Sequence, residues 1–307
     1  MTDQIRQNQL GRSGLMVSCV GLGCNNFGRR LDREGTRRVI DAALDVGITL
    51  FDTADVYGGG GESERLIGEL LGDRRDRVVL ATKFGMDMGD GTEARGAPEY
   101  VRRAVRASLE RLRTDRIDLY YYHRPDGITP LEETLGTLAE LADEGTIRAY
   151  GVSNVDADQL REANAAAGGD RRLAAVQNEY NLLDRSAERD VLPAAAELGI
   201  GFIPYFPLAS GLLSGKFHRD QPPPSGTRMA DRWDEVEPPM FDRIEALESF
   251  AAERHRTLLE LAFAGLLAQP GLASVIAGAM TPEQVAANAM AGSWQLADED
   301  AAELAHV

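Results

Sequence analysis

Four polar residues fall where apolar, strand-like runs of the sequence end, or shortly after such an end. Asp52, Lys83 and His123 each close such a run, and Tyr57 follows Asp52 by five positions. A carboxylate, an ammonium, an imidazole and a phenol together suit the reduction of a carbonyl group, in which a hydride reaches the carbon and the oxygen gains a proton. We therefore treat these four residues as the candidate catalytic group.

Each side chain of this group has a distinct expected role. Tyr57 would donate the proton, and because a free phenol has a pKa of about 10, a neighbouring cation such as Lys83 would help by stabilising the phenolate. Asp52 would pair with Lys83, while His123 would hydrogen-bond the carbonyl oxygen and orient the substrate. A structural explanation is also open, in which the acid and the lysine form an ordinary buried ion pair, the tyrosine lies at a rim and the histidine is a satisfied core residue.

Lysine is almost absent from this chain. Of the 33 basic residues only Lys83 and Lys216 are lysines, and all the others are arginines. A planar guanidinium cannot replace a compact ammonium whose pKa is easily moved. The retention of Lys83 against this bias favours a chemical role for it.

Short apolar runs alternate with longer segments of helical periodicity, and these elements must position the catalytic candidates. Such alternation is typical of repeated βα units. Helices are predicted at residues 34–46, 98–111, 130–143 and 187–198. Strands are predicted at residues 19–22, 49–52, 78–83, 117–123, 149–153, 175–179, 201–205 and 274–276. Together with the length of 307 residues, this pattern predicts an α/β fold, a (β/α)8 TIM barrel that forms one domain over residues 1–307.

The barrel prediction gives the catalytic candidates a common location. Active sites of such barrels lie at the carboxyl ends of the strands. The intervals of 31 and 40 residues between Asp52, Lys83 and His123 each match one βα repeat. These three side chains are therefore expected on adjacent strands, where they can converge.

Two segments lie outside the repeat. The piece before Cys19 predicts a short hairpin that could cover one mouth of the barrel, and residues 210–239, rich in proline, predict a long lid loop after the seventh strand. Phe27, Met86 and Trp233 are expected to line the substrate pocket.

Composition excludes several classes of partner. A formal net charge of −16 and a pI near 4.8 oppose binding to nucleic acids and to anionic membranes. The chain start lacks the layout of a signal peptide, and the most apolar long stretch, residues 258–280, is interrupted by polar residues and a proline. The spacing of the two cysteines, Cys19 and Cys24, fits neither a redox pair nor a zinc site. We expect a cytoplasmic protein without a metal, acting on a small molecule.

A resemblance to a known family covers nearly the whole chain. Residues 51–58, Phe-Asp-Thr-Ala-Asp-Val-Tyr-Gly, together with Ser63, Glu64 and Gly68, resemble the aspartate and tyrosine segment of the aldo-keto reductases. The resemblance implies a (β/α)8 barrel that reduces aldehydes or ketones to alcohols with NAD(P)H. It also implies that Tyr57 is the proton donor.

The same resemblance implies which residues hold the nicotinamide cofactor. Residues 151–154 and 177–180 resemble the segments that hold the nicotinamide amide, Tyr205 the aromatic residue that stacks on the nicotinamide ring, and residues 207–216 the pyrophosphate segment. The implied cofactor contacts are Cys24, Asn25, Asp52, Ser153, Asn154, Gln177, Tyr205, Pro207, Leu208, Ser210, Gly211, Lys216, Arg228, Gly278, Met280, Gln284 and Asn288.

One segment bears on the choice between NADP and NAD. Residues 274–284 resemble the segment that receives the adenosine 2′-phosphate at a helix N-terminus, a site that suits anions. Met280, Thr281 and Ala287 depart from the family pattern, because relatives often carry a hydroxyl, a basic residue and an acid at these positions. NADP is still expected in preference to NAD.

The sequence also bears on three other interpretations. Residues 123–126, His-Arg-Pro-Asp, and the lid also resemble the potassium-channel β-subunit branch of the family, which acts as a cofactor-bound regulatory partner; that branch tends to carry asparagine where this chain has His123. A phosphate-binding lyase or isomerase barrel gives no reason for Tyr57. A Rossmann fold is not supported, because residues 21–26 lack the third glycine of the fingerprint and no helix follows them.

Overall fold

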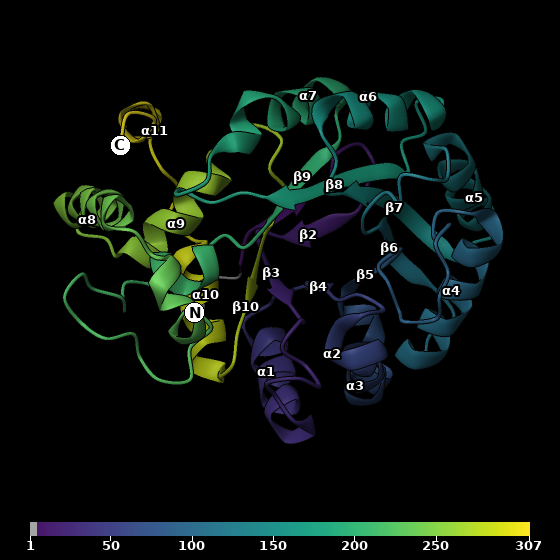
Figure 1. Ribbon diagram of the computed structural model, residues 1–307, viewed down its shortest axis with the longest axis horizontal. Helices are drawn as coiled ribbons and strands as arrows, with labels where there is room; N and C mark the ends of the chain where they lie inside the picture. The colour runs from purple at the N-terminus through teal and green to yellow at the C-terminus, as the bar shows by residue number, and fades with distance from the viewer. Residues whose placement is uncertain (1–4) are drawn as a thin grey trace.

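The molecule is built around a ring of parallel strands. The computed structural model describes residues 5–307, except for the side chains of residues 231, 232 and 235. Eight parallel strands run in the order β10-β3-β4-β5-β6-β7-β8-β9 (Figure 1). Hydrogen bonds from Phe202 N to Gly271 O (2.9 Å) and from Ala273 N to Phe202 O (3.0 Å) join β9 to the segment entering β10. The predicted (β/α)8 barrel is confirmed.

The barrel strands agree with the sequence prediction to within two residues at each end. Their bounds are β3 (Val20–Gly23), β4 (Leu50–Asp52), β5 (Val79–Phe84), β6 (Ile117–Tyr122), β7 (Ile147–Ser153), β8 (Leu173–Glu179), β9 (Gly201–Tyr205) and β10 (Val275–Gly278). The runs were recognisable because these strands are buried on both faces and therefore read as continuous apolar segments.

Helices form a layer around the outside of the strands (Figure 1). They are α1 (Arg33–Asp45), α2 (Tyr57–Gly60), α3 (Glu62–Leu71), α4 (Pro98–Leu112), α5 (Leu131–Asp143), α6 (Ala157–Ala166), α7 (Val191–Leu198), α8 (Pro238–Glu253), α9 (Leu258–Leu267), α10 (Pro282–Ala291) and α11 (Asp298–Leu304). The helix predicted to begin at residue 187 begins at Val191, because the Asp190 side chain caps it by accepting from Val191 N at 2.6 Å. None of these helices, in the part of the chain described, has the length and apolar character needed to cross a membrane.

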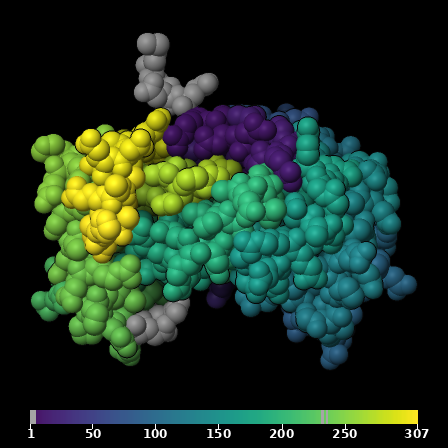
Figure 2. All heavy atoms as spheres, turned by 90° about the horizontal axis from the view of Figure 1, so that it is seen from above, coloured from purple at the N-terminus to yellow at the C-terminus, as the bar shows by residue number. Residues whose placement is uncertain are grey.

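The predicted N-terminal hairpin is present and closes the amino end of the barrel. It consists of antiparallel strands β1 (Gln7–Gln9) and β2 (Met16–Ser18), and its side chains Leu10, Leu15 and Val17 join the core inside the barrel. Figure 2 shows this segment in purple, at the surface beside the yellow C-terminal segment. The hairpin therefore covers the amino ends of the strands and leaves their carboxyl ends open.

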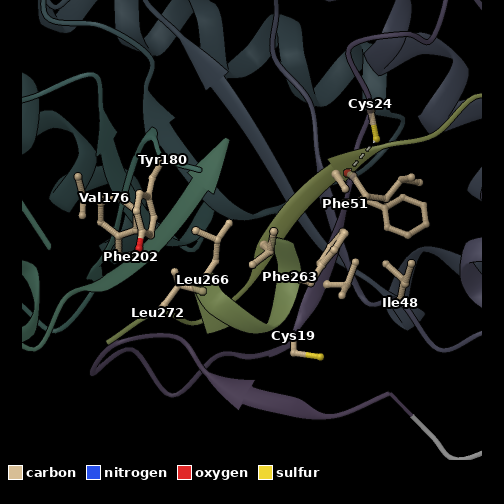
Figure 3. Close-up of a cluster of buried hydrophobic side chains, with 14 of the residues drawn as sticks. Cys19, Cys24, Ile48, Phe51, Val176, Tyr180, Phe202, Phe263, Leu266 and Leu272 are labelled. Atoms are coloured by element: carbon tan, nitrogen blue, oxygen red, sulfur yellow. Dashed lines mark hydrogen bonds between the residues drawn. The ribbon is translucent and has the colours of Figure 1, made fainter. Parts of the chain in front are cut away.

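A second core lies between the strands and the helices. In the view of Figure 3, Phe263 and Leu266 of α9 lie between Phe51 on one side and Phe202 on the other, and all four belong to one cluster of buried apolar side chains. This cluster extends around the barrel to the other helices. The strand ends are therefore held from inside and outside, which limits the movement of any residue attached to them.

The predicted long loop follows β9, the seventh strand of the barrel. It runs from residue 206 to residue 237 and contains short 3-10 turns at Ala209–Ser214 and Ala230–Glu235. Trp233 stacks on Phe217 (5.8 Å between ring centroids) and contacts Phe241 of α8 (5.7 Å). The prediction that Trp233 lines the substrate pocket is wrong, because the ring packs into the base of the lid.

The close packing of the hairpin turn against the barrel predicts that a substitution at Gly11 lowers the free energy of unfolding. Gly11 has φ +51°, and a Cβ there would lie 2.6 Å from Ala174 O and 2.7 Å from Gly201 N. We expect Gly11→Ala to lower the free energy of unfolding by about 2–4 kcal/mol, the sum of left-handed strain and a backbone clash. Gly14→Ala is the matched control, since Gly14 has φ +79° but open space around it, and it should cost about 1 kcal/mol. Urea unfolding measures both, and equal losses would mean that the hairpin does not pack tightly on the barrel.

Candidate active site

A buried ion pair forms the floor of the site. Lys83 Nζ donates to Asp52 Oδ1 (2.5 Å) and to Thr53 O (2.9 Å), and Gln177 Nε2 donates to Asp52 Oδ2 (2.9 Å). The Lys83 side chain is completely buried. Burial lowers the pKa of Lys83, but Asp52 and Tyr57 more than offset this effect, and the pKa ends above its ordinary value. The lysine is therefore a fixed cation.

Tyr57 lies against this cation. Lys83 Nζ is 5.2 Å from the centre of the Tyr57 ring, and the ring meets that of His123 edge to face at 5.9 Å. Burial raises the pKa of Tyr57, and Lys83 acts in the opposite direction without cancelling the rise. Lys83 thus favours the phenolate, as expected, but the pKa of Tyr57 still rises because the effect of burial is larger than that of Lys83. The phenol stays protonated at neutral pH.

The turn after Tyr57 depends on close packing. Gly58 has φ +74°, and a Cβ there would lie 2.8 Å from Phe27 O and 2.9 Å from Ser63 N.

Phe27 itself is completely buried in the core between strands and helices. The prediction that Phe27 lines the pocket is therefore wrong, whereas Met86, the third residue of that set, does line it.

His123 is held as a neutral imidazole. It follows β6, where its backbone N donates to Phe84 O at 2.8 Å. Burial, with smaller contributions from Lys83 and Arg124, lowers the pKa of His123 to about 3. Its buried Nδ1 has no hydrogen-bond partner among the described residues. A neutral imidazole in this position can donate one N–H to a ligand in the cavity.

An amide network connects the ends of four strands. Tyr205 OH donates to Asn154 Oδ1 (2.7 Å), and Asn154 Nδ2 donates to His123 O (2.9 Å). Ser153 Oγ donates to Gln177 O (2.7 Å). These bonds join the ends of β6, β7, β8 and β9, so the side chains there are oriented before any ligand arrives.

A cavity of about 720 Å³ opens at the carboxyl ends of the strands, a volume typical of small-molecule and cofactor sites. Of the catalytic candidates, Asp52, Tyr57 and His123 line it, while Lys83 lies directly behind them. The predicted cofactor residues that line it are Cys24, Asn25, Asp52, Asn154, Gln177, Tyr205, Pro207, Leu208, Ser210, Gly211, Lys216, Arg228, Gly278, Met280, Gln284 and Asn288. Ser153 is buried and does not line the cavity, and its hydroxyl accepts from Asn154 Nδ2 (3.0 Å) and donates to the backbone Gln177 O.

Sequence reasoning missed several lining residues. Arg30 donates to Gly226 O at 2.9 Å and so ties the loop after β3 to the lid. Phe206 presents its ring beside Tyr205 at 5.2 Å, with the Arg228 guanidinium 5.4 Å from its centre. Phe206 and Arg124 each follow a residue that was predicted, so extending the strand-end rule by one position would have found both.

The charges that line the cavity contrast with those of the whole chain. Among the side chains that the structure describes, four cations line it, namely Arg30, Arg124, Lys216 and Arg228, whereas the lining carboxylate of Asp52 is already paired with Lys83. The rest of the molecule gives the chain its net charge of −16. A cationic cavity in an acidic protein favours an anionic ligand.

Comparisons with known proteins point to one family. The model of the aldo/keto reductase family matches residues 19–307. The "Uncharacterized oxidoreductase YrpG" of Bacillus subtilis (strain 168) is 40% identical over 289 residues, which cover 90% of this chain and 87% of that protein. The "Probable aldo-keto reductase 1" of Glycine max is 35% identical over 314 residues, which cover 98% of this chain and 88% of that protein.

A solved structure supports the same assignment. The holo form of the aldo-keto reductase AKR11C1 from Bacillus halodurans superposes with a TM-score of 0.83 and 32% sequence identity. The match covers 99% of this chain and 96% of that chain.

The neutral state of His123 predicts a pH dependence of stability. The pKa of His123 is about 3 in the folded protein and about 6.5 in an unfolded chain, so between these values only the unfolded state binds the proton. The contribution of His123 to the free energy of unfolding must therefore fall as the pH drops below about 6.5. We expect His123→Gln to lose less stability than the parent between pH 7 and pH 5, by up to about 2 kcal/mol.

Urea unfolding at the two pH values measures this difference. The exposed His218, replaced in His218→Gln, is the control and should leave the pH dependence of the parent unchanged. An identical pH dependence in His123→Gln and the parent would show that folded His123 takes up a proton as an ordinary histidine does.

Proposed function

Because this chain belongs to the aldo/keto reductase family, we propose that it reduces the carbonyl group of aldehydes or ketones with NADPH and that Tyr57 supplies the proton. The family assignment makes it an oxidoreductase and supports a carbonyl group as the part of the substrate that reacts. The proposal that Tyr57 supplies the proton rests mainly on one observation: Tyr57, His123 and the Asp52–Lys83 pair converge at the floor of one cavity.

The residues of the cavity fit a nicotinamide dinucleotide. Its phosphates need cations and backbone N–H groups, and the segment after β9 offers Lys216 together with a left-handed turn at Ala209, Ser210 and Gly211, with φ of +45°, +58° and +108°. Consecutive left-handed residues are costly and tend to occur where a ligand is clamped. Asn154 and Gln177 would hold the nicotinamide amide, with Tyr205 against the ring. Arg228 would cover the dinucleotide from the lid.

A nicotinamide cofactor in this position would supply the hydride. The protein contributes the proton and its control. Tyr57 donates its phenolic proton to the carbonyl oxygen as the alcohol forms, and Lys83 stabilises the phenolate that remains until solvent returns the proton. Asp52 keeps Lys83 charged and in place. The neutral His123 donates an N–H to the same carbonyl oxygen and so fixes the direction from which the carbon is approached.

NADP is favoured over NAD by the cations around the cavity. Arg30, Lys216 and Arg228 come from the loops after β3 and β9, the two strands that flank β10 in the ring. Helix α10, which follows β10, begins at the Thr281 cap. A 2′-phosphate at the start of this helix would therefore have cations on both sides, although Thr281 itself is not basic.

The proton-donor role is tested by Tyr57→Phe. We expect kcat to fall about 10²- to 10⁴-fold, because the variant keeps the ring and loses the proton. NADPH binding, followed by quenching of tryptophan fluorescence in parallel with NADH, should be unchanged and should favour NADPH. Near-parental turnover of Tyr57→Phe would refute the role. Tight cofactor binding by the parent without turnover of any carbonyl would favour a regulatory protein instead.

The two lysines give a matched pair of variants for the activation of Tyr57. Lys83→Arg keeps the charge, but the larger guanidinium has no room at a fully buried position between Asp52 and Tyr57, so kcat should fall at least about 10-fold. Lys216→Arg should retain kcat, because Lys216 is exposed and a phosphate accepts either cation. Steady-state kinetics on one aldehyde compares them. Full activity of Lys83→Arg would mean that Tyr57 does not depend on a compact ammonium.

A further inference from the structure

One of the four described cations that line the cavity lies apart from the other three. Arg124 follows His123 at the carboxyl end of β6. In the strand order β10-β3-β4-β5-β6-β7-β8-β9, β6 is four places from β10 in either direction around the ring. Arg124 is therefore on the opposite rim from β10 and the cations that flank it. A dinucleotide with its phosphates near β10 leaves Arg124 without an anion.

Arg124 is exposed to the cavity and makes no hydrogen bond or ion pair with any residue that the structure describes. The nearest acidic residue in the sequence is Asp126, and both of its carboxylate oxygens already accept hydrogen bonds from other groups. Its Oδ1 accepts from the backbone N of Ile128 and Thr129 (2.8 Å each), and its Oδ2 accepts from Gly96 N (2.7 Å) and the Thr129 hydroxyl (2.9 Å). The positive charge of Arg124 is thus available to a ligand.

The carboxylates of the site that belong to the described residues do not compete for this charge either. Asp52 accepts from Lys83 and Gln177 on its two oxygens. Glu179, which acts electrostatically on Tyr205 as Arg124 does, lies outside the cavity lining and forms no ion pair with Arg124.

Arg124 directly follows His123 in the chain and lines the same cavity as Tyr57. Its charge acts on the imidazole of His123 and on the phenol of Tyr205. Met86 and Phe206 provide apolar lining elsewhere in the cavity. A small molecule whose carbonyl oxygen reaches Tyr57 and His123 could therefore bring a second functional group to Arg124.

We propose that the substrate is a small carbonyl compound that carries an anionic group, a carboxylate or a phosphate, and that Arg124 binds this group. A guanidinium suits either anion because it donates two parallel hydrogen bonds to a pair of oxygens. This inference rests on the proposed function and adds the class of substrate. It assigns Arg124 to substrate binding and not to the transfer of the proton or the hydride.

The test compares matched anionic and neutral aldehydes in the parent and in Arg124→Gln with NADPH. One pair is para-carboxybenzaldehyde and its methyl ester, and the other is glyceraldehyde phosphate and glyceraldehyde. Arg124→Gln should lower kcat/KM for an anionic aldehyde about 10- to 100-fold, mainly through KM, and change the neutral counterpart less than about twofold. Arg124→Lys should keep part of the preference. The pair that shows the larger loss identifies the anion as carboxylate or phosphate.

Arg106→Gln is the matched control, because Arg106 is an exposed arginine on the outer helix α4 and its loss changes the net charge equally. Equal losses on charged and neutral aldehydes, or no loss on either, would overturn the inference while leaving carbonyl reduction intact. If no carbonyl is reduced, the proposed function fails, and calorimetric titration with para-(hydroxymethyl)benzoate decides the inference alone. Binding by the parent that Arg124→Gln abolishes supports it, and equal binding or no binding by both rejects it.

Discussion

The burial of Lys83 is the constraint on which the rest of the site depends. An ammonium removed from water is stable only if anions and hydrogen-bond acceptors replace the solvent, and the loss of one partner of such a pair typically costs about 3–5 kcal/mol. Here the partners are Asp52 and Thr53 O, and Gln177 occupies the remaining carboxylate oxygen. The charge therefore binds the ends of β4, β5 and β8 to one another. Tyr57 and His123 are positioned against a group that cannot move.

Burial has opposite consequences for the two groups beside that cation. It raises the pKa of Tyr57 and lowers that of His123, so both are neutral at the pH of a cell. Two neutral donors beside one fixed positive charge suit the stabilisation of an oxygen that becomes negative, because no proton has to be rearranged before the reaction. The positive charge of the cavity lining thus comes from Lys216 and the arginines, since Lys83 is paired with Asp52, and the proton comes from a neutral acid.

Much of this arrangement could be predicted from the sequence, for physical reasons. Strands buried on both faces read as apolar runs, and the end of each run gave Asp52, Lys83 and His123 without reference to a family. Tyr57 owed its role mainly to resemblance, since nothing in a loop sequence shows where a side chain points. The net direction of its pKa was not predictable, because burial and the charge of Lys83 oppose each other and only packing decides between them.

The hairpin that closes the amino end of the barrel affects how the protein can evolve. Leu10, Leu15 and Val17 complete the core inside the barrel. The loops at the opposite rim therefore need to contribute little to the stability of the fold. Substitutions or length changes in those loops can alter which molecules are accepted while the base maintains the fold. Mutations that change stability and mutations that change substrate selectivity therefore fall largely in different parts of the barrel. After gene duplication, one copy could evolve activity on a new substrate through changes in its rim loops while the barrel itself stays the same.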